Sequence, residues 1–148
     1  MVAITTAITP PTASSGTSVS TTSFQANWTS VPGVSNYRID ISTSSDFSSY
    51  VSGYQNRLVT NATNLSISGL TPGRKYYYRV RSQGDNVSSS NSNSVEVTTV
   101  ISAPVTLEET AKTNTGFQIN WSTVSGALSY GLDVSEQSNF SSFVTGDN

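Results

Sequence analysis

The 148-residue chain contains no cysteine and no histidine. The absence of cysteine excludes disulfide bonds and thiol nucleophiles, and the absence of both residues excludes the usual zinc ligand sets. A catalytic triad that depends on histidine is excluded as well. The sequence therefore predicts a protein that is not an enzyme, with no catalytic residue, no metal ligand and no cofactor.

Charge is also scarce, at 11% of the residues, with only 7 Lys and Arg against 9 Asp and Glu. Nucleic acid requires a concentrated basic patch, so it is not an expected partner. The acidic residues are scattered along the chain. They have neither the spacing of a calcium-binding loop nor a close pair suited to acid–base chemistry.

Long apolar runs are missing too. No segment approaches the roughly 20 apolar residues that cross a membrane, so no membrane insertion is expected. What the chain has in abundance is 29 Ser and 20 Thr, together about a third of the residues. Aromatic residues make up 9% and are regularly spaced. This composition is typical of a folded protein with a hydroxyl-rich surface rather than of a disordered chain.

Apolar and polar residues alternate in five short segments. These are FQANW from Phe24, YRIDIS from Tyr37, LSIS from Leu65, YYYRVRS from Tyr76 and VEVTT from Val95. A period of two is typical of strands with one buried face, and VPGV, TPGR and QGDN between them are turn signals. The predicted fold class is all-β, an immunoglobulin-like antiparallel β-sandwich of seven strands.

An internal repeat divides the chain. The stretch that begins PTASSG at Pro11 aligns without a gap with the stretch that begins PVTLEE at Pro104, at an offset of 93 (104 minus 11). Residues 2–11 align with residues 95–104 at the same offset. We therefore expect four parts. They are the last strand of a preceding repeat and its linker (1–8), a complete domain (9–99), a short linker (100–103) and the N-terminal half of a second copy (104–148).

The ordered motifs of the complete unit resemble the fibronectin type III family. Trp28 is followed by Tyr37 and by the motif Leu-x-Pro-Gly-x-x-Tyr, which runs from Leu70 to Tyr76. The resemblance implies fibronectin type III topology and a tyrosine corner, in which the Tyr76 hydroxyl bonds to backbone near Leu70. The structural core that it implies consists of Trp28, Tyr37, Leu70 and Tyr76 and, in the truncated copy, Trp121 and Tyr130.

The particular sequence of the unit is similar to modules found in tandem in secreted and surface proteins of Bacteroidetes. That similarity implies a bacterial protein that is secreted or lies at the cell surface, where such modules stand beside hydrolase, adhesin or sorting domains.

One loop of the unit is a candidate adhesive site. It contains Gln83, Gly84 and Asp85, one substitution away from the Arg-Gly-Asp triplet that the adhesive module of fibronectin carries in the same connection. Gln83 provides no cation to pair with the carboxylate. We expect instead a turn in which Gly84 supplies a positive φ and Asp85 with Asn86 stabilises the turn.

The outward side of one sheet is the second candidate surface. Alternation directs to it the ligand-face candidates Arg38, Tyr77, Arg79 and Arg81, together with Asp40 and Glu96. A tyrosine beside an arginine can stack on a sugar ring or on a partner's side chain. The competing interpretation is ordinary cross-strand pairing on a solvated sheet.

The expected function is that of a non-catalytic tandem repeat, a spacer, stalk or protein-interaction scaffold in an extracellular or cell-surface protein. The linker 100–103 is short and lacks glycine, which favours a semi-rigid row of domains. The alternative is a carbohydrate-binding accessory module of a secreted polysaccharide hydrolase, which would use Tyr77 and Arg79.

Neighbouring repeats of the same chain are the expected partners, and other surface proteins or glycans stay open. The half copy at 104–148 lacks the strands on which it would close, and a piece of this size seldom buries enough surface to fold alone. We expect a loosely packed tail, a fragment of a longer protein, or an exchange of strands with a second molecule.

Overall fold

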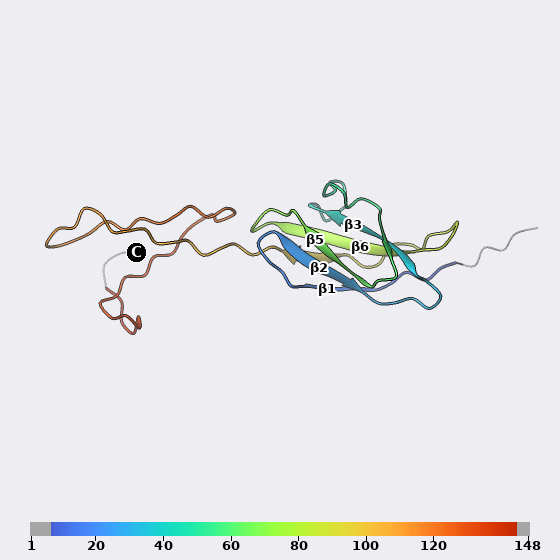
Figure 1. The fold of residues 1–148 in the computed structure, drawn as a ribbon, viewed down its shortest axis with the longest axis horizontal. Helices are drawn as coiled ribbons and strands as arrows, with labels where there is room; N and C mark the ends of the chain where they lie inside the picture. Colours follow the sequence, from blue (N-terminus) through green and yellow to red (C-terminus); the bar gives the residue numbers. More distant parts are fainter. Residues whose placement is uncertain (1–6, 145–148) are drawn as a thin grey trace, which may run out of the picture.

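The alternating segments form strands in the computed structural model, which describes residues 7–144 (Figure 1). Seven strands follow along the chain: β1 (Ala13–Thr17), β2 (Ser23–Trp28), β3 (Asn36–Ser42), β4 (Arg57–Thr60), β5 (Asn64–Ser68), β6 (Lys75–Gln83) and β7 (Val95–Thr98). The strand of a preceding repeat that was expected within residues 1–8 lies outside the described residues, apart from positions 7 and 8, which belong to no strand.

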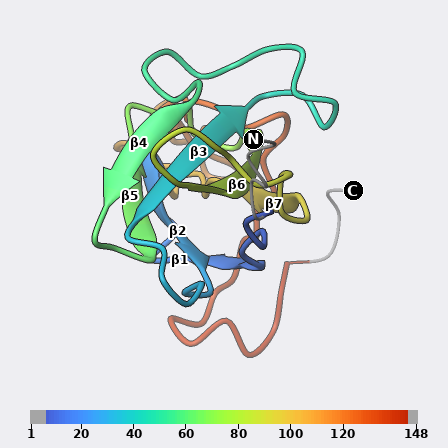
Figure 2. The same ribbon diagram turned by 90° about the vertical axis from the view of Figure 1, so that its right-hand side faces the viewer.

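The strands form two sheets that pack face to face. One sheet has the order β1-β2-β5 and the other the order β4-β3-β6-β7. Every pairing is antiparallel, and the longest, between β3 and β6, runs from Asn36 opposite Gln83 to Ser42 opposite Tyr77. Figure 2 shows the two layers from the end at which the chain enters. The predicted all-β sandwich is confirmed.

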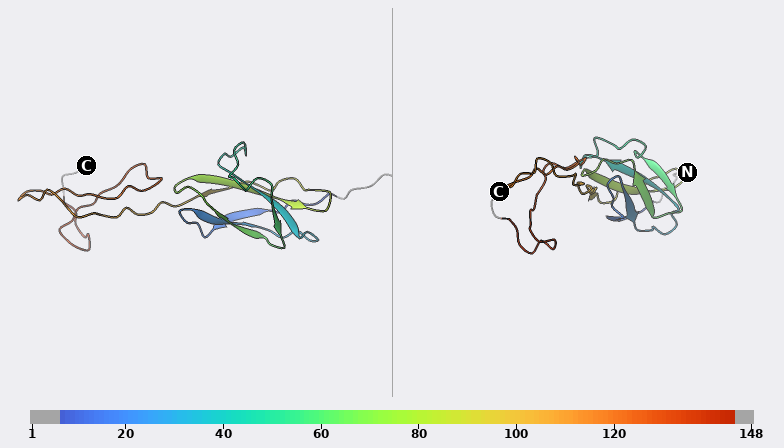
Figure 3. Two further views of the ribbon diagram at one scale, coloured as in Figure 1. Left: turned by 45° about the horizontal axis from the view of Figure 1, so that its top comes forward. Right: turned by 60° about the vertical axis from the view of Figure 1, so that its left-hand side comes forward.

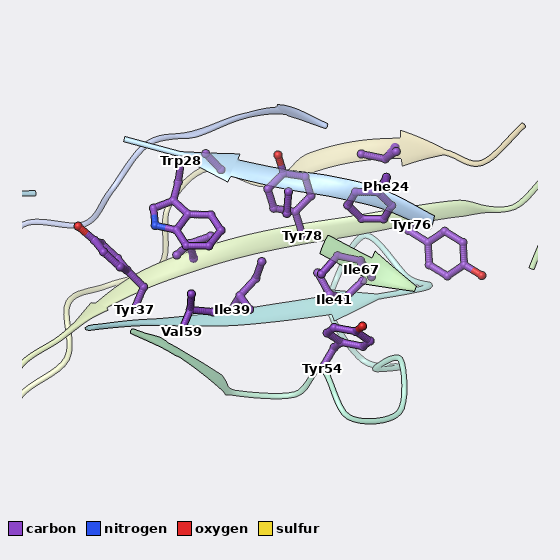
Figure 4. Packing of buried hydrophobic residues seen from close by; sticks show 14 of the residues in the cluster. Phe24, Trp28, Tyr37, Ile39, Ile41, Tyr54, Val59, Ile67, Tyr76 and Tyr78 are labelled. Carbon is purple, nitrogen blue, oxygen red and sulfur yellow. The ribbon is translucent and has the colours of Figure 1, made fainter. Parts of the chain in front are cut away.

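Aromatic rings fill the space between the sheets (Figure 4). The ring of Trp28 on β2 lies edge-on to that of Tyr37 on β3, with centroids 5.7 Å apart, and Phe24 on β2 lies 5.9 Å from Tyr78 on β6. Burial of each such ring stabilises the fold by roughly 1.5–3 kcal/mol. All residues of the buried hydrophobic cluster lie within residues 13–97, so the sandwich contains its own complete core.

The turn before β6 closes one end of this core. Leu70 and Tyr76 are 6% and 3% exposed. The Tyr76 hydroxyl accepts a hydrogen bond from the N–H of Thr71 at 2.9 Å, which is the geometry of a tyrosine corner. Gly73 lies in the same turn with a φ of +66°, a conformation that glycine adopts without a steric penalty.

Strand β3 departs from the simple alternation of its sequence. Asp40 and Ser42 lie on its outer side, yet they are only 2% and 0% exposed. The connection from β3 to β4, residues 43–56, folds back beside the strand, and its Val51 N–H donates to the carbonyl oxygen of Ile41 at 2.9 Å. Asp40, which alternation directs to the outward side of the sheet, is therefore covered by this connection and not solvated.

Residues 104–144 follow as an extended segment in which the structure contains only isolated bridges (Figure 3). The bridges join Thr106 to Trp121 and Thr110 to Gln118. After subtraction of 93 these become positions 13 with 28 and 17 with 25, which are paired in the same way between β1 and β2. The segment has the hydrogen-bond register of the first unit without its regular sheet.

The segment also repeats aromatic contacts of the first unit but does not bury them. The rings of Trp121 and Tyr130 lie 5.8 Å apart, close to the 5.7 Å between Trp28 and Tyr37. In contrast to the core positions expected for them, Trp121 and Tyr130 are 37% and 39% exposed. The physical reason is that no strand within residues 104–144 lies opposite them to close a second sandwich.

Two matched tyrosines test this difference. The hydroxyl of Tyr37 accepts a hydrogen bond from the N–H of Val31 at 2.9 Å, and that of Tyr130 accepts one from Val124 at 2.7 Å. We expect Tyr37→Phe to lower the free energy of unfolding by about 1–2 kcal/mol, because it leaves a buried donor unpaired. Tyr130→Phe should leave it unchanged, because water replaces the exposed bond. Urea unfolding followed by tryptophan fluorescence measures the free energy for both variants. Equal losses would contradict the difference in burial between Tyr37 and Tyr130.

Candidate functional site

The outer side of the four-stranded sheet carries the predicted ligand-face residues. Strand register places Arg38 opposite Arg81 and Asp40 opposite Arg79 on β3 and β6. Tyr77 lies opposite Glu96 on β7. Residues that lie directly opposite each other on neighbouring strands point to the same face of a sheet. The four predicted residues therefore come together on one surface.

Asp40 is the centre of this surface. Its Oδ2 accepts hydrogen bonds from Arg81 Nη1 at 2.9 Å and Arg79 Nε at 3.2 Å, and its Oδ1 accepts one from the N–H of Asn56 at 2.7 Å. Burial by itself would raise the pKa of the Asp40 carboxyl. The hydrogen bonds from Asn56 and Arg81, with the charge of Arg81, outweigh burial and hold the pKa below its ordinary value.

The β3–β4 connection packs over Arg79 on the outer side of the sheet. The guanidinium of Arg79 lies 4.0 Å from the centroid of the Phe47 ring, in cation–π geometry. Phe47 is 6% exposed and has a φ of +61°, which is unusual for a bulky residue. Nearby, Asp46 accepts hydrogen bonds from the hydroxyls of Ser44 and Ser48, and these lower its pKa to about 2.

The remaining arginine contacts are also made within the domain. Arg38 donates through Nη1 to the carbonyl oxygen of Asn56 at 3.0 Å. Arg81 donates through Nη1 to Asn91 Oδ1 at 2.9 Å. Three of the four predicted ligand-face residues, Arg38, Arg79 and Arg81, therefore bind the β3–β4 connection or the β6–β7 loop to the sheet. This favours the interpretation of cross-strand pairing over that of a free binding face.

Tyr77 is the aromatic member of the predicted face, and it is half-buried. Its neighbours are Lys75 and Glu96, which form an ion pair at 2.8 Å with side chains 61% and 46% exposed. An exposed pair of this kind is worth little, because both charges remain solvated. Tyr77 lies two residues from Arg79 along β6, between Ser42 on β3 and Glu96 on β7, and makes none of the hydrogen bonds to Asp40.

The loop with the near-adhesive triplet has a different structure from the one expected. Gly84 does not have a positive φ, in contrast to our expectation. Its N–H donates to the carbonyl oxygen of Val87 at 2.8 Å, which closes the turn. A Cβ atom at Gly84 would lie 2.8 Å from Cδ1 of Ile8. The chain that enters the domain therefore packs closely against the loop at Gly84.

A cleft of about 740 Å³ lies beside this loop, at the end of the sandwich where the chain enters. Ile8, Pro32, Gly33, Gly84 and Asp85 are among the residues that line it. The cleft is separate from the Asp40 cluster, which contributes no residue to its lining. Among residues 7–144 no three acidic side chains lie close enough together to hold a metal ion, and no helix is long and apolar enough to cross a membrane.

Two antiparallel sheets with the orders β1-β2-β5 and β4-β3-β6-β7, closed by a tyrosine corner, agree with what comparison of sequences finds. The profile of the family described as Fibronectin type III domain matches residues 9–98. The chain belongs to the fibronectin type III family. A search among curated proteins finds no match.

Solved structures share the fibronectin type III fold of this chain. A Fn3-like protein from Clostridium thermocellum is 28% identical, with a TM-score of 0.51 over 62% of this chain and 92% of that one. The domain of human fibronectin type III domain containing protein 3 is 18% identical, with a TM-score of 0.52 over 66% and 91%.

A beta-1,2-glucanase from Parabacteroides distasonis is 20% identical, with a TM-score of 0.53. The match covers 64% of this chain but only 13% of the glucanase. The likeness to this enzyme is therefore a likeness of fold in one small part of it.

Sequence reasoning missed the partners that the fibronectin type III domain brings to Asp40. Asn56 and Phe47 come from a connection that contains no alternating pattern. One signal was available, since Phe47 and Tyr50 are the aromatic residues of the otherwise polar segment STSSDFSSY. Large apolar side chains in a polar connection indicate that it folds inward over the domain.

We expect Asp40→Asn to destabilise the domain by roughly 2–3 kcal/mol, less than for a wholly buried pair because both arginines are partly exposed. Because folding lowers the pKa of Asp40, its stabilising effect is present above the ordinary carboxyl pKa and is lost as pH falls through the lowered value. Urea unfolding from pH 7 to pH 2 should show the difference from wild type shrinking below about pH 4.

Glu96→Gln is the matched control, since it removes an exposed partner from the same face. It should leave stability at pH 7 almost unchanged. A loss for Asp40→Asn no larger than for this control would contradict the role given to the cluster.

Proposed function

We propose that this chain is part of a tandem array of fibronectin type III domains that acts as a non-catalytic spacer or stalk, or as an interaction scaffold, in an extracellular or cell-surface protein. The observation that carries the proposal is the repetition of the same local structure at an offset of 93. A function that requires one unit alone would not call for a second copy in the same register.

The repetition extends to single hydrogen bonds. The hydroxyl of Ser42 donates to Ser44 and Ser49 carbonyl oxygens at 2.9 and 2.6 Å. The hydroxyl of Ser135 donates to the carbonyl oxygens at positions 137 and 142 at 3.0 and 2.6 Å. Since 135 minus 93 is 42, the same turn follows the same position in both units, which supports their common role as repeats.

The join between the units is short and partly anchored. Val100, the first linker residue, donates its N–H to the carbonyl oxygen of Ser20 at 3.1 Å. At the entering end, the hydroxyl of Ser82 donates to the carbonyl oxygen of Thr9 at 2.8 Å. Since Thr9 corresponds to Ser102 at the offset of 93 (102 minus 93), a linker within the array would be held by the domains on both sides and transmit their orientation, as a stalk requires.

The carbohydrate-binding alternative has less support from the geometry. A sugar site needs exposed aromatic rings beside free polar groups. On the predicted face, Arg79 and Arg81 are bound to Asp40, and Phe47 is 6% exposed. Tyr77 is the one aromatic candidate that remains on the outer side of β6, where it is half-buried.

A scattering experiment tests the stalk. Residues 7–99 can be followed directly by residues 7–148, because position 7 corresponds to position 100 at the repeat offset (100 minus 93). The nine residues of β6 indicate a unit about 30 Å long. Small-angle X-ray scattering should show the maximum dimension growing by about this length or slightly more per added unit. A constant maximum dimension would mean that the units fold back on each other.

A binding experiment tests the alternative. We expect no change of tryptophan or tyrosine fluorescence when the full chain is titrated with a panel of soluble polysaccharides, because the arginines of the face are already paired. A response that disappears in Tyr77→Ala but persists in the remote control Tyr130→Ala would establish glycan binding. It would show that the domain is not merely a spacer.

A further inference from the structure

The turn at Pro72 and Gly73 contacts the second copy at the end of the sandwich where the chain leaves. A Cβ atom at Gly73 would lie 2.8 Å from Cγ2 of Ile101 and 3.1 Å from the carbonyl oxygen of Gly126. A Cβ atom at Gly126 would lie only 2.5 Å from the carbonyl oxygen of Pro72. The two turns therefore meet backbone to backbone beside Ile101, and only glycine leaves the space for this approach.

Thr99 holds the first of these turns in place. It is 2% exposed, and its hydroxyl donates to the carbonyl oxygen of Thr71 at 2.7 Å. The same Oγ1 accepts a hydrogen bond from the N–H of Arg74 at 3.0 Å, and the Thr99 N–H donates to the carbonyl oxygen of Arg74 at 3.0 Å. The turn is thus presented by the end of β7 as a rigid projection rather than as a loose loop.

The residues that receive the turn have counterparts at the opposite end of the sandwich. Subtraction of 93 converts Gly126 into Gly33 and Ile101 into Ile8. The φ angles of Gly126 and Gly33 are +86° and +76°. The hydrogen bond that closes the turn measures 3.2 Å between positions 127 and 124 and 3.1 Å between positions 34 and 31. The two receiving turns have the same shape.

These counterparts line the 740 Å³ cleft at the end viewed in Figure 2. A Cβ atom at Gly33 would meet no atom of residues 7–144 within 4 Å, so these residues leave the space in front of this turn open. Ile8 packs against Gly84 and makes that loop one wall of the cleft. Asp85 also lines the cleft, and it is opposite in charge to Arg74, which follows Gly73 in the projecting turn.

We propose that the cleft lined by Ile8, Gly33 and Gly84 is a docking socket for the turn at Pro72 and Gly73 of another copy of this repeat. This occupant follows from the chain itself, where the same turn already lies against the corresponding Ile101 and Gly126. Consecutive units then lock end to end, and the loop with Gln83, Gly84 and Asp85 is a wall of the joint. The proposal rests on the tandem array and adds how its units are held.

The chain with residues 7–99 followed by residues 7–148 supplies the socket with its occupant. Its first unit contains all seven strands and the whole buried cluster, and thus everything needed to fold. We expect ¹⁵N relaxation to give both sandwiches one common rotational correlation time. Gly33→Ala in the second unit should separate the two sandwiches, because the new methyl group meets the Pro72 carbonyl of the first unit. The correlation time of the second sandwich should then fall to that of residues 7–148 alone.

Gly33→Ala in the first unit is the matched control. It imposes the same backbone strain at a positive φ but faces no preceding turn, so it should leave the common tumbling intact. Ile8→Ser in the second unit, with Ile8→Ser in the first as its control, repeats the test without changing a glycine. Two native sandwiches that tumble independently before any substitution would overturn the socket, and the array would then be a flexible spacer if the maximum dimension in scattering still grows with each added unit. Equal effects of Gly33→Ala in both units would also overturn it, and a constant maximum dimension in scattering would reject the stalk itself.

Discussion

The packing of aromatic rings between two sheets is the interaction on which this structure depends. The chain has no disulfide to hold the sheets together. Trp28 against Tyr37 and Phe24 against Tyr78 bridge them instead. Because the side chains of a strand alternate between its faces, a shift of one residue in β2 would turn Phe24 and Trp28 to solvent. The same rings thus provide stability and set the register, and a polar, weakly charged surface can vary around them.

The strands that carry this alternating pattern could be predicted from the sequence, whereas β1 and β4 could not be located. β2, β3, β5, β6 and β7 fall on the five alternating segments. β1 consists of ASSGT, which has no large apolar residue, and β4 consists of RLVT, in which Val59 is buried but Leu58 is 50% exposed. Without an alternating apolar pattern, β1 and β4 are defined by hydrogen bonds to a neighbouring strand, and these depend on the fold rather than on local sequence.

The outer face of the four-stranded sheet shows the same limit of prediction from sequence for the candidate site. Alternation correctly brought Arg38, Tyr77, Arg79 and Arg81 to one side, because that requires only the period of the strands. It did not predict that residues 43–56 would cover Asp40, because the covering contacts join positions far apart in sequence. Gly84 was likewise assigned a positive φ from the chemistry of the turn alone. Its φ is not positive, and the loop packs against Ile8, which is distant in the sequence.

Residues 104–144 separate the structure that local sequence determines from the structure that burial determines. Residues 104–144 repeat the pairings and turns of the first unit but leave Trp121 and Tyr130 exposed. Local hydrogen bonds therefore set the shape of residues 104–144, while burial of their apolar side chains would need further strands lying opposite. In a repeat array each unit gains further stability from contacts with its neighbours. A joint made of glycine backbones suits such an array, because it depends on close approach and shape and leaves the surface side chains of each unit free to change.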